Sequence, residues 1–151
     1  MLDDNFYMAK ALSLAKQAAE QGEIPVGALI VSGDGAILSE AYNLRETKNS
    51  AIAHAEILAI EQACQKLGRW RLFDCTLYVT LEPCFMCAGA IVLARLPRVV
   101  YGAQDPKAGA VKNLATVLND PRLNHQCQVE GGLMAEEAGL LLKEFFRARR
   151  R

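Results

Sequence analysis

Residues 75–95, CTLYVTLEPCFMCAGAIVLAR, decide the fold of this chain. The first part, residues 75–81, is apolar and rich in β-branched and aromatic side chains, a pattern that favours a buried strand. Glu82 and Pro83 then form an abrupt turn, and a proline is well suited to the first turn of a helix. We therefore predict a helix over residues 84–95, so that the chain passes directly from a buried strand into a helix.

The rest of the chain alternates between helical and strand patterns. Apolar residues at helical spacing predict helices over residues 4–21, 53–67 and 134–147 or beyond, with a short helical piece over 113–118. Apolar and β-branched runs predict strands over residues 26–31, 36–42, 98–101 and 127–130. The sequence has no internal repeat and no linker of low complexity. This order predicts an α/β fold, with one sheet of about five strands covered by helices on both faces, in a single domain over residues 1–151.

The composition is that of a folded domain in a reducing compartment. The chain has 151 residues, 52% of them hydrophobic, and a domain of this size buries a core without the help of disulfides. Its N-terminus, MLDDNFYMAK, lacks the features of a secretory signal, and the longest nearly apolar run, residues 84–94, is too short to span a bilayer. Without such a signal, five cysteines favour metal binding over disulfides. We therefore expect a cytoplasmic protein with no membrane partner.

Two short motifs hold side chains that bind metals: HAE at residues 54–56 and PCFMC at residues 83–87. Cys84 and Cys87 are three residues apart in the first turn of a predicted helix, where the helix dipole favours thiolates. Together with His54 they make three protein ligands for zinc. A structural zinc site normally has four protein ligands, whereas a catalytic site leaves the fourth position to water.

Glu56 is the candidate catalytic residue. On a helix it would be rotated by about 200° from His54, but in a first turn both side chains can border one cavity. A carboxylate beside a zinc-bound water can take up the proton that the metal acidifies and pass it to a substrate. The alternative is a structural Cys-Cys-His site in which Glu56 only complements the charge at the helix N-terminus. The two motifs together, with a strand that ends directly before PCFMC, favour the catalytic interpretation.

H-x-E followed by P-C-x-x-C is the signature of the zinc nucleoside and nucleobase deaminases. From about Phe6 to Arg149, the chain resembles the bacterial tRNA-specific adenosine deaminase family. The stretches that carry the resemblance are EIPVGA (23–28), HAEI (54–57), LYVTLEPCFMCAG (77–89), RVVYGAQD (98–105), KAGA (107–110), NH (124–125) and FFR (145–147).

The resemblance implies a three-layer α/β/α cytidine-deaminase-like fold, a homodimer and one zinc ion per subunit. It also implies a zinc-dependent hydrolase that converts adenosine to inosine at the wobble position, position 34, of a tRNA anticodon. In the bacterial family this tRNA is the arginine tRNA with the anticodon ACG. Zinc-bound hydroxide would attack the base while Glu56 moves protons, and the single-stranded anticodon loop makes it easy to extrude the base.

Carried over position by position, the family's zinc ligands fall on His54, Cys84 and Cys87, and its proton shuttle falls on Glu56. Asn43 matches the asparagine that hydrogen-bonds the purine. The other substrate-binding residues that the resemblance implies outside the C-terminal tail are Ala55, Asp105, Lys107 and Asn124.

The C-terminal tail, KEFFRARRR at residues 143–151, holds five basic side chains and one acidic, a net charge of +4. Because the whole chain has 17 basic and 17 acidic groups, residues 1–142 carry a net charge of −4. The balance excludes a basic coat over the whole surface and leaves a local one. The alternative is a solvated helix end whose cations complement the helix dipole. With the resemblance, we expect RNA contacts from Phe145, Arg147, Arg149 and Arg150.

Two other functions remain open at this point. The first is a zinc-dependent deaminase of a free base or nucleotide, such as guanine, cytidine or dCMP, which uses the same chemistry. The second is a zinc-stabilised RNA-binding module without catalysis, which predicts four protein ligands and no dependence on Glu56. The basic tail and the loop at residues 105–110 favour an RNA substrate, because a closed pocket for a small molecule needs neither.

Overall fold

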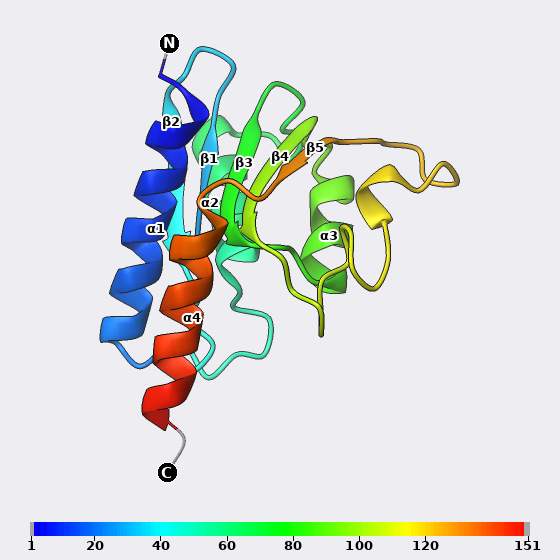
Figure 1. Ribbon diagram of the computed structural model, residues 1–151. Helices are drawn as coiled ribbons and strands as arrows, with labels where there is room; N and C mark the ends of the chain where they lie inside the picture. The colour runs from blue at the N-terminus through cyan, green and yellow to red at the C-terminus, as the bar shows by residue number, and fades with distance from the viewer. Residues whose placement is uncertain (1, 150–151) are drawn as a thin grey trace.

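The structure, a computed structural model, describes residues 2–149 and centres on one five-stranded mixed sheet (Figure 1). The strands lie in the order β2-β1-β3-β4-β5. β1 is antiparallel to both β2 and β3, whereas β3, β4 and β5 are mutually parallel. Their bounds are β1 Gly27–Val31, β2 Ile37–Tyr42, β3 Thr76–Leu81, β4 Arg98–Ala103 and β5 Gln128–Gly131.

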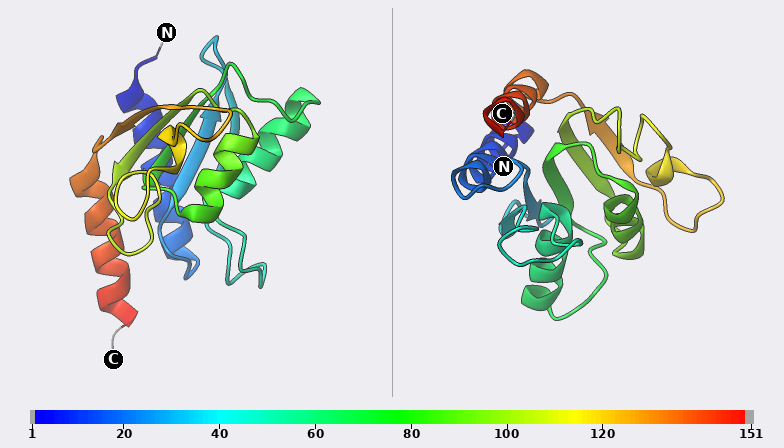
Figure 2. Two further views of the ribbon diagram at one scale, coloured as in Figure 1. Left: turned by 90° about the vertical axis from the view of Figure 1, so that its right-hand side faces the viewer. Right: turned by 90° about the horizontal axis from the view of Figure 1, so that it is seen from below.

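Helices cover both faces of this sheet, so the chain forms three layers. Seen from below, α1 and α4 (blue and orange-red) lie on one face and α2 and α3 (both green) on the other (Figure 2). Their bounds are α1 Asp4–Glu20, α2 Ala55–Leu67, α3 Phe85–Leu93 and α4 Ala135–Arg149. This is the predicted α/β/α architecture, and the prediction of the fold class is confirmed. None of the helices in the described part of the chain is long and apolar enough to cross a membrane.

The core is divided by the sheet according to the alternation of side chains along each strand. On β3, Leu77 and Val79 belong to the larger apolar cluster under α2 and α3, while Tyr78 belongs to the cluster under α1. β3 is central and its apolar residues are covered from both sides, which explains why its sequence reads as a nearly continuous apolar run.

The topology brings the loops that matter to one edge of the sheet. Because β1 is antiparallel to both of its neighbours, β2 points in the same direction as β3 and β4. The loops that follow these three strands therefore emerge at the same edge, the lower edge in Figure 1. α2 and α3 also begin there. In open α/β sheets, ligands bind at the carboxyl ends of the strands.

One predicted element is wrong. The helical piece expected over residues 113–118 is instead a run of turns followed by a short 3-10 helix, η1, at Val117–Asn119. The physical reason lies in the backbone pairing: Leu114 donates its amide to the carbonyl of Gly109 and Val117 donates to that of Ala110, so neither amide makes the bond to the fourth residue before it that an α-helix needs. The other predicted helices and strands are confirmed, with ends that shift by up to two residues.

Candidate active site

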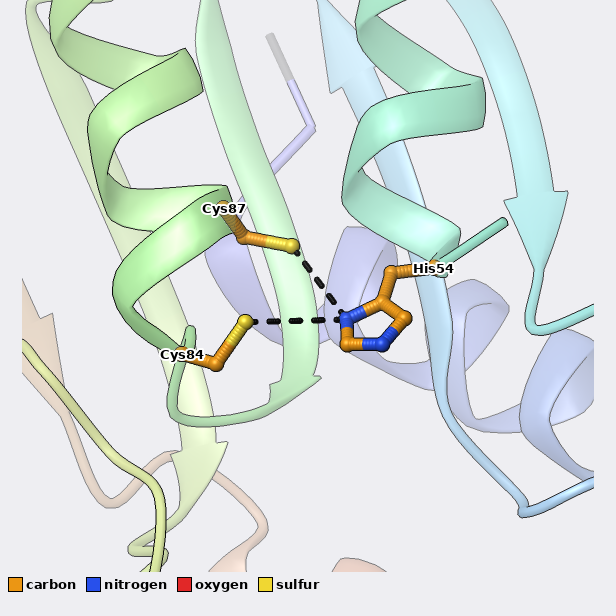
Figure 3. Close-up of side chains that lie close together, drawn as sticks. All are labelled: His54, Cys84 and Cys87. Carbon is orange, nitrogen blue, oxygen red and sulfur yellow. Dashed lines mark hydrogen bonds between the residues drawn. The ribbon is translucent and has the colours of Figure 1, made fainter. Parts of the chain in front are cut away.

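The two metal-binding motifs, some 30 residues apart in the chain, come together at the lower edge of the sheet (Figure 3). The Nδ1 atom of His54 lies 3.6 Å from Cys84 Sγ and 3.5 Å from Cys87 Sγ. The candidate ligand atoms of all three residues lie within 4.8 Å of one another. Two sulfurs and one imidazole nitrogen are donors that suit a zinc ion.

The two motifs use the same local geometry. His54 is the N-cap of α2 and Cys84 is the N-cap of α3, and both have an extended backbone. Each side chain therefore leaves the chain just before a helix begins, where backbone N–H groups and the helix dipole favour negative charge. Cys87 follows in the first turn of α3 and is fully buried.

Glu56 lies in the first turn of α2, beside the three candidate ligands, and its side chain is only 4% exposed. The predicted 200° rotation from His54 does not apply, because His54 precedes the helix and has no helical backbone. Both residues consequently line one pocket. Burial raises the pKa of Glu56 to about 7, against the opposing effects of its own backbone amide and of His54.

The two cysteines differ in their protonation. The pKa of Cys84 falls to about 3, because hydrogen bonds from the Cys87 thiol and from His54 outweigh the cost of burial. The pKa of Cys87 is raised, first by that hydrogen bond and then by burial. The hydrogen bond between the two cysteines therefore favours a thiolate at Cys84 over one at Cys87. Among the described residues the cluster contains no fourth His, Cys, Asp or Glu, which fits a metal that keeps one position for another ligand.

A pocket of about 180 Å³ opens in front of this cluster. Four of the predicted substrate or catalytic residues line it, namely Asn43, Ala55, Glu56 and Asp105. Asn43 is buried, and its Oδ1 accepts a hydrogen bond of 3.0 Å from the backbone of Arg45, which holds the side chain in place. The pocket also contains residues to which the sequence assigned no role: Ile24, Val26, Arg45, Leu81, Glu82 and Ala108. Four of them lie in the stretches EIPVGA and LYVTLEPCFMCAG. The resemblance carried by these stretches was the one signal in the sequence that could have pointed to them.

The C-terminal helix contributes to a second hollow, which we call the tail groove, that continues from the pocket. The tail groove has a volume of about 350 Å³ and shares Ile24, Asn43 and Arg45 with the pocket. Its other lining residues are Gly22, Glu23, Glu46, Phe145, Phe146 and Arg149. The Arg149 guanidinium lies 4.0 Å from the centre of the Phe145 ring, so cation and aromatic face are presented together.

The remaining predicted residues that the structure describes line neither the pocket nor the tail groove. Lys107 is exposed in the loop beside Asp105, whose Oδ1 accepts from the amides of Lys107 and Ala108. Arg147 is exposed and does not line the tail groove, and Arg150 lies outside the described residues. The structure does not bring Asn124 to the pocket, because it is exposed in the loop before β5, so its RNA contact stays a prediction.

Comparisons with known proteins agree with this geometry. Residues 2–150 match the MafB19-like deaminase family. A tRNA-specific adenosine deaminase of Bacillus subtilis (strain 168) is 52% identical over all of this chain and 93% of its own length. A structure solved in a study of A-to-I editing by tRNA:A34 deaminases at the wobble position is 44% identical, with a TM-score of 0.87 over 91% of this chain and 99% of that one. A guanine deaminase from Bacillus subtilis is 43% identical, with a TM-score of 0.66, but covers only 68% of this chain and 66% of its own.

Proposed function

This chain belongs to the family of tRNA-specific adenosine deaminases, and from that premise we propose that it converts adenosine to inosine at position 34 of a tRNA anticodon. The arginine tRNA with the anticodon ACG is the expected substrate. The observation that carries the proposal is the continuity of the pocket with the tail groove. A base that enters the pocket reaches His54, Cys84 and Glu56, while its flanking nucleotides meet Phe145 and Arg149.

We propose that His54, Cys84 and Cys87 hold one zinc ion. The fit is supported by the soft sulfur and imidazole donors and by the thiolate character of Cys84. When bound, zinc supplies a water molecule whose pKa is lowered toward 7.

The remaining chemistry falls to the side chains of the pocket. The net reaction adds one water at C6 of adenine and releases ammonia, so that the carbonyl oxygen of inosine replaces the amino group. Glu56 accepts a proton from the water and delivers it to N1, and then carries a second proton to the departing amino group. A single carboxylate can serve both transfers because it is buried next to the candidate ligands and lines the pocket that would hold the base. Asn43 and the backbone of Ala55 orient the purine.

RNA recognition is assigned to the rim of the pocket. The tail groove combines two neighbouring aromatic rings, the half-buried Phe145 and the exposed Phe146, with Arg149 and Arg45, which suits unstacked bases joined by phosphates. Asp105 and Lys107 would contact the anticodon loop from the opposite side. The guanine deaminase shares the fold but covers a smaller part of the chain, and the tail groove favours RNA over a free base.

We also propose that the enzyme is a homodimer that acts in the cytoplasm, where tRNA is found. The outer side of α3 supports a second copy, because Phe85 and Leu93 are 53% and 70% exposed there. A contiguous apolar patch on the surface is typical of an interface with another protein.

The direct test is an activity assay with three substrates. We expect the purified, zinc-loaded protein to form inosine in an anticodon stem-loop with adenosine at the wobble position, and to release no ammonia from guanine or cytidine. A stem-loop with guanosine at that position is the matched control. Ammonia released from free bases alone would favour the guanine, cytidine or dCMP deaminase instead.

The tail groove makes a separate prediction about binding. Arg149→Ala should weaken binding of the stem-loop several-fold. The plot of the logarithm of the binding constant against the logarithm of the salt concentration should become less steep by about 1, because one phosphate contact is lost. The measurement is a fluorescence titration at several salt concentrations. Lys66→Ala is the control, because Lys66 lies in the last turn of α2, away from the pocket edge where that helix begins. An unchanged salt slope for Arg149→Ala would contradict the contact.

A further inference from the structure

Glu82 has no role in the mechanism above, yet its carboxylate accepts five hydrogen bonds. It is 2% exposed and lies between the end of β3 and the N-cap Cys84. Its Oε1 accepts from the amide of Asp105 at 3.0 Å and from Asn113 Nδ2. Its Oε2 accepts from the amides of Val111, Lys112 and Asn113 at 3.2, 2.8 and 3.0 Å.

All five donors belong to one segment, residues 105–113, which we call the substrate loop. This loop supplies Asp105 and Ala108 to the pocket wall, and it carries the exposed Lys107 between them. Hydrogen bonds to an ionised, buried acceptor are about twice as strong as neutral ones. The carboxylate therefore holds both ends of the substrate loop at once.

The backbone around Glu82 ties the same loop to the candidate metal site. Ala110 donates its amide to the carbonyl of Pro83 at 2.8 Å, and Cys84 pairs with Gly109 in an isolated antiparallel bridge. Gly109 packs directly against the Glu82 carboxylate, and a Cβ atom at that position would overlap all three carboxylate atoms. Only glycine lets the loop close onto Glu82 this tightly.

From these contacts we propose that Glu82 is a positioning residue, which sets the substrate loop at a defined place relative to the candidate metal ligands. The inference rests on the proposed function, because the loop matters for RNA only if RNA is the substrate. Glu82 lies in the pocket wall, but both of its carboxylate oxygens are taken up by the hydrogen bonds to the substrate loop. It acts through Asp105, Lys107 and Ala108, so that a nucleotide in the pocket meets a preformed wall.

The test uses Glu82→Gln, which keeps the shape of the side chain but replaces one oxygen with an NH₂ group. That group cannot accept, so at least part of the substrate loop loses its acceptor. Amide hydrogen exchange of residues 105–113 should become at least about tenfold faster, while exchange in β3 and β4 stays unchanged. With the stem-loop substrate, KM should rise at least about tenfold and kcat should change by less than about threefold. If Glu82 only stabilised the fold, the variant would contain a smaller fraction of active molecules, so the apparent kcat would fall while KM stayed unchanged.

Two further variants keep the test decisive. Gly109→Ala pushes on the carboxylate from the loop side and should shift exchange and KM in the same direction, even if Glu82→Gln does not fold. Glu40→Gln, at an exposed position on β2, makes the same chemical change and should leave both readouts at their wild-type values.

The outcomes separate this inference from the proposed function. The positioning role would be overturned if Glu82→Gln and Gly109→Ala both showed wild-type amide exchange, or if exchange became faster with an unchanged KM. Either result could occur while the wild-type enzyme edits the stem-loop normally. A wild-type enzyme that edits no RNA would instead overturn the proposed function.

Discussion

Glu56→Gln is expected to lower kcat on the stem-loop by about 10³-fold or more, with metal content unchanged. The amide has nearly the shape of the carboxylate but cannot carry a proton between water and base, and general acid–base catalysis contributes about 10²–10⁴-fold to a rate. The effect should fall at the upper end of that range, because we assign both proton transfers to one group. Glu56 is not among the grouped candidate metal ligands, so the metal should stay bound.

The measurement combines single-turnover kinetics with metal analysis of the same sample. Glu61→Gln is a matched control, since Glu61 is an exposed glutamate on the same helix, α2. It should retain wild-type turnover. Residual activity above about a tenth of wild type in Glu56→Gln would remove the carboxylate from its assigned role, because such a loss is smaller than general acid–base catalysis provides.

The second large effect concerns the metal ligands. Cys87→Ser should reduce the metal content from one ion per chain to a small fraction and abolish turnover. The three donors lie within 4.8 Å of one another, and loss of a thiolate leaves only His54 and Cys84 from this cluster. Because a bound metal stabilises the folded state by mass action, a chelator should lower the melting temperature of the wild type and leave that of Cys87→Ser unchanged.

Cys64→Ser is the control for this prediction. Cys64 is a half-buried free cysteine in α2 that lies outside the candidate metal cluster, so its replacement should keep both metal and activity. If Cys87→Ser still bound one metal ion per chain, the assigned ligand set would be wrong. If a chelator left wild-type activity intact, the need for a metal would be refuted.

The sequence was most informative where structure depends on neighbours in the chain. The strand that became β3 and the helix that became α3 were both predicted, because apolar periodicity and a proline after the strand are local signals. The spacing of HAE and PCFMC identified His54, Glu56, Cys84 and Cys87 for a similar reason, since each motif lies at the start of one helix.

The prediction failed at residues 113–118, where the backbone amides donate outside the helical pattern. Leu114 donates to the carbonyl of Gly109 and Val117 to that of Ala110, so the segment folds back on the loop that Glu82 holds. Glu82 lies 29 to 31 residues from the three amides that it accepts from, and no pattern within a short window reveals an acceptor so far away. The tail shows the same limit: its basic and aromatic residues were recognised, but not which of them line the tail groove.

The sequence by itself therefore determined all but one of the predicted elements, the candidate ligands and the chemical class, because these follow from local periodicity and from residue types at fixed spacing. Only the tertiary structure decided that the loops after β2, β3 and β4 meet at one edge, since this depends on strand direction within the sheet. It also decided that the amides of the substrate loop meet Glu82 and that Phe145 and Arg149 line the tail groove. Those contacts join distant segments, and the register of the sheet and the packing of α4 bring them within reach.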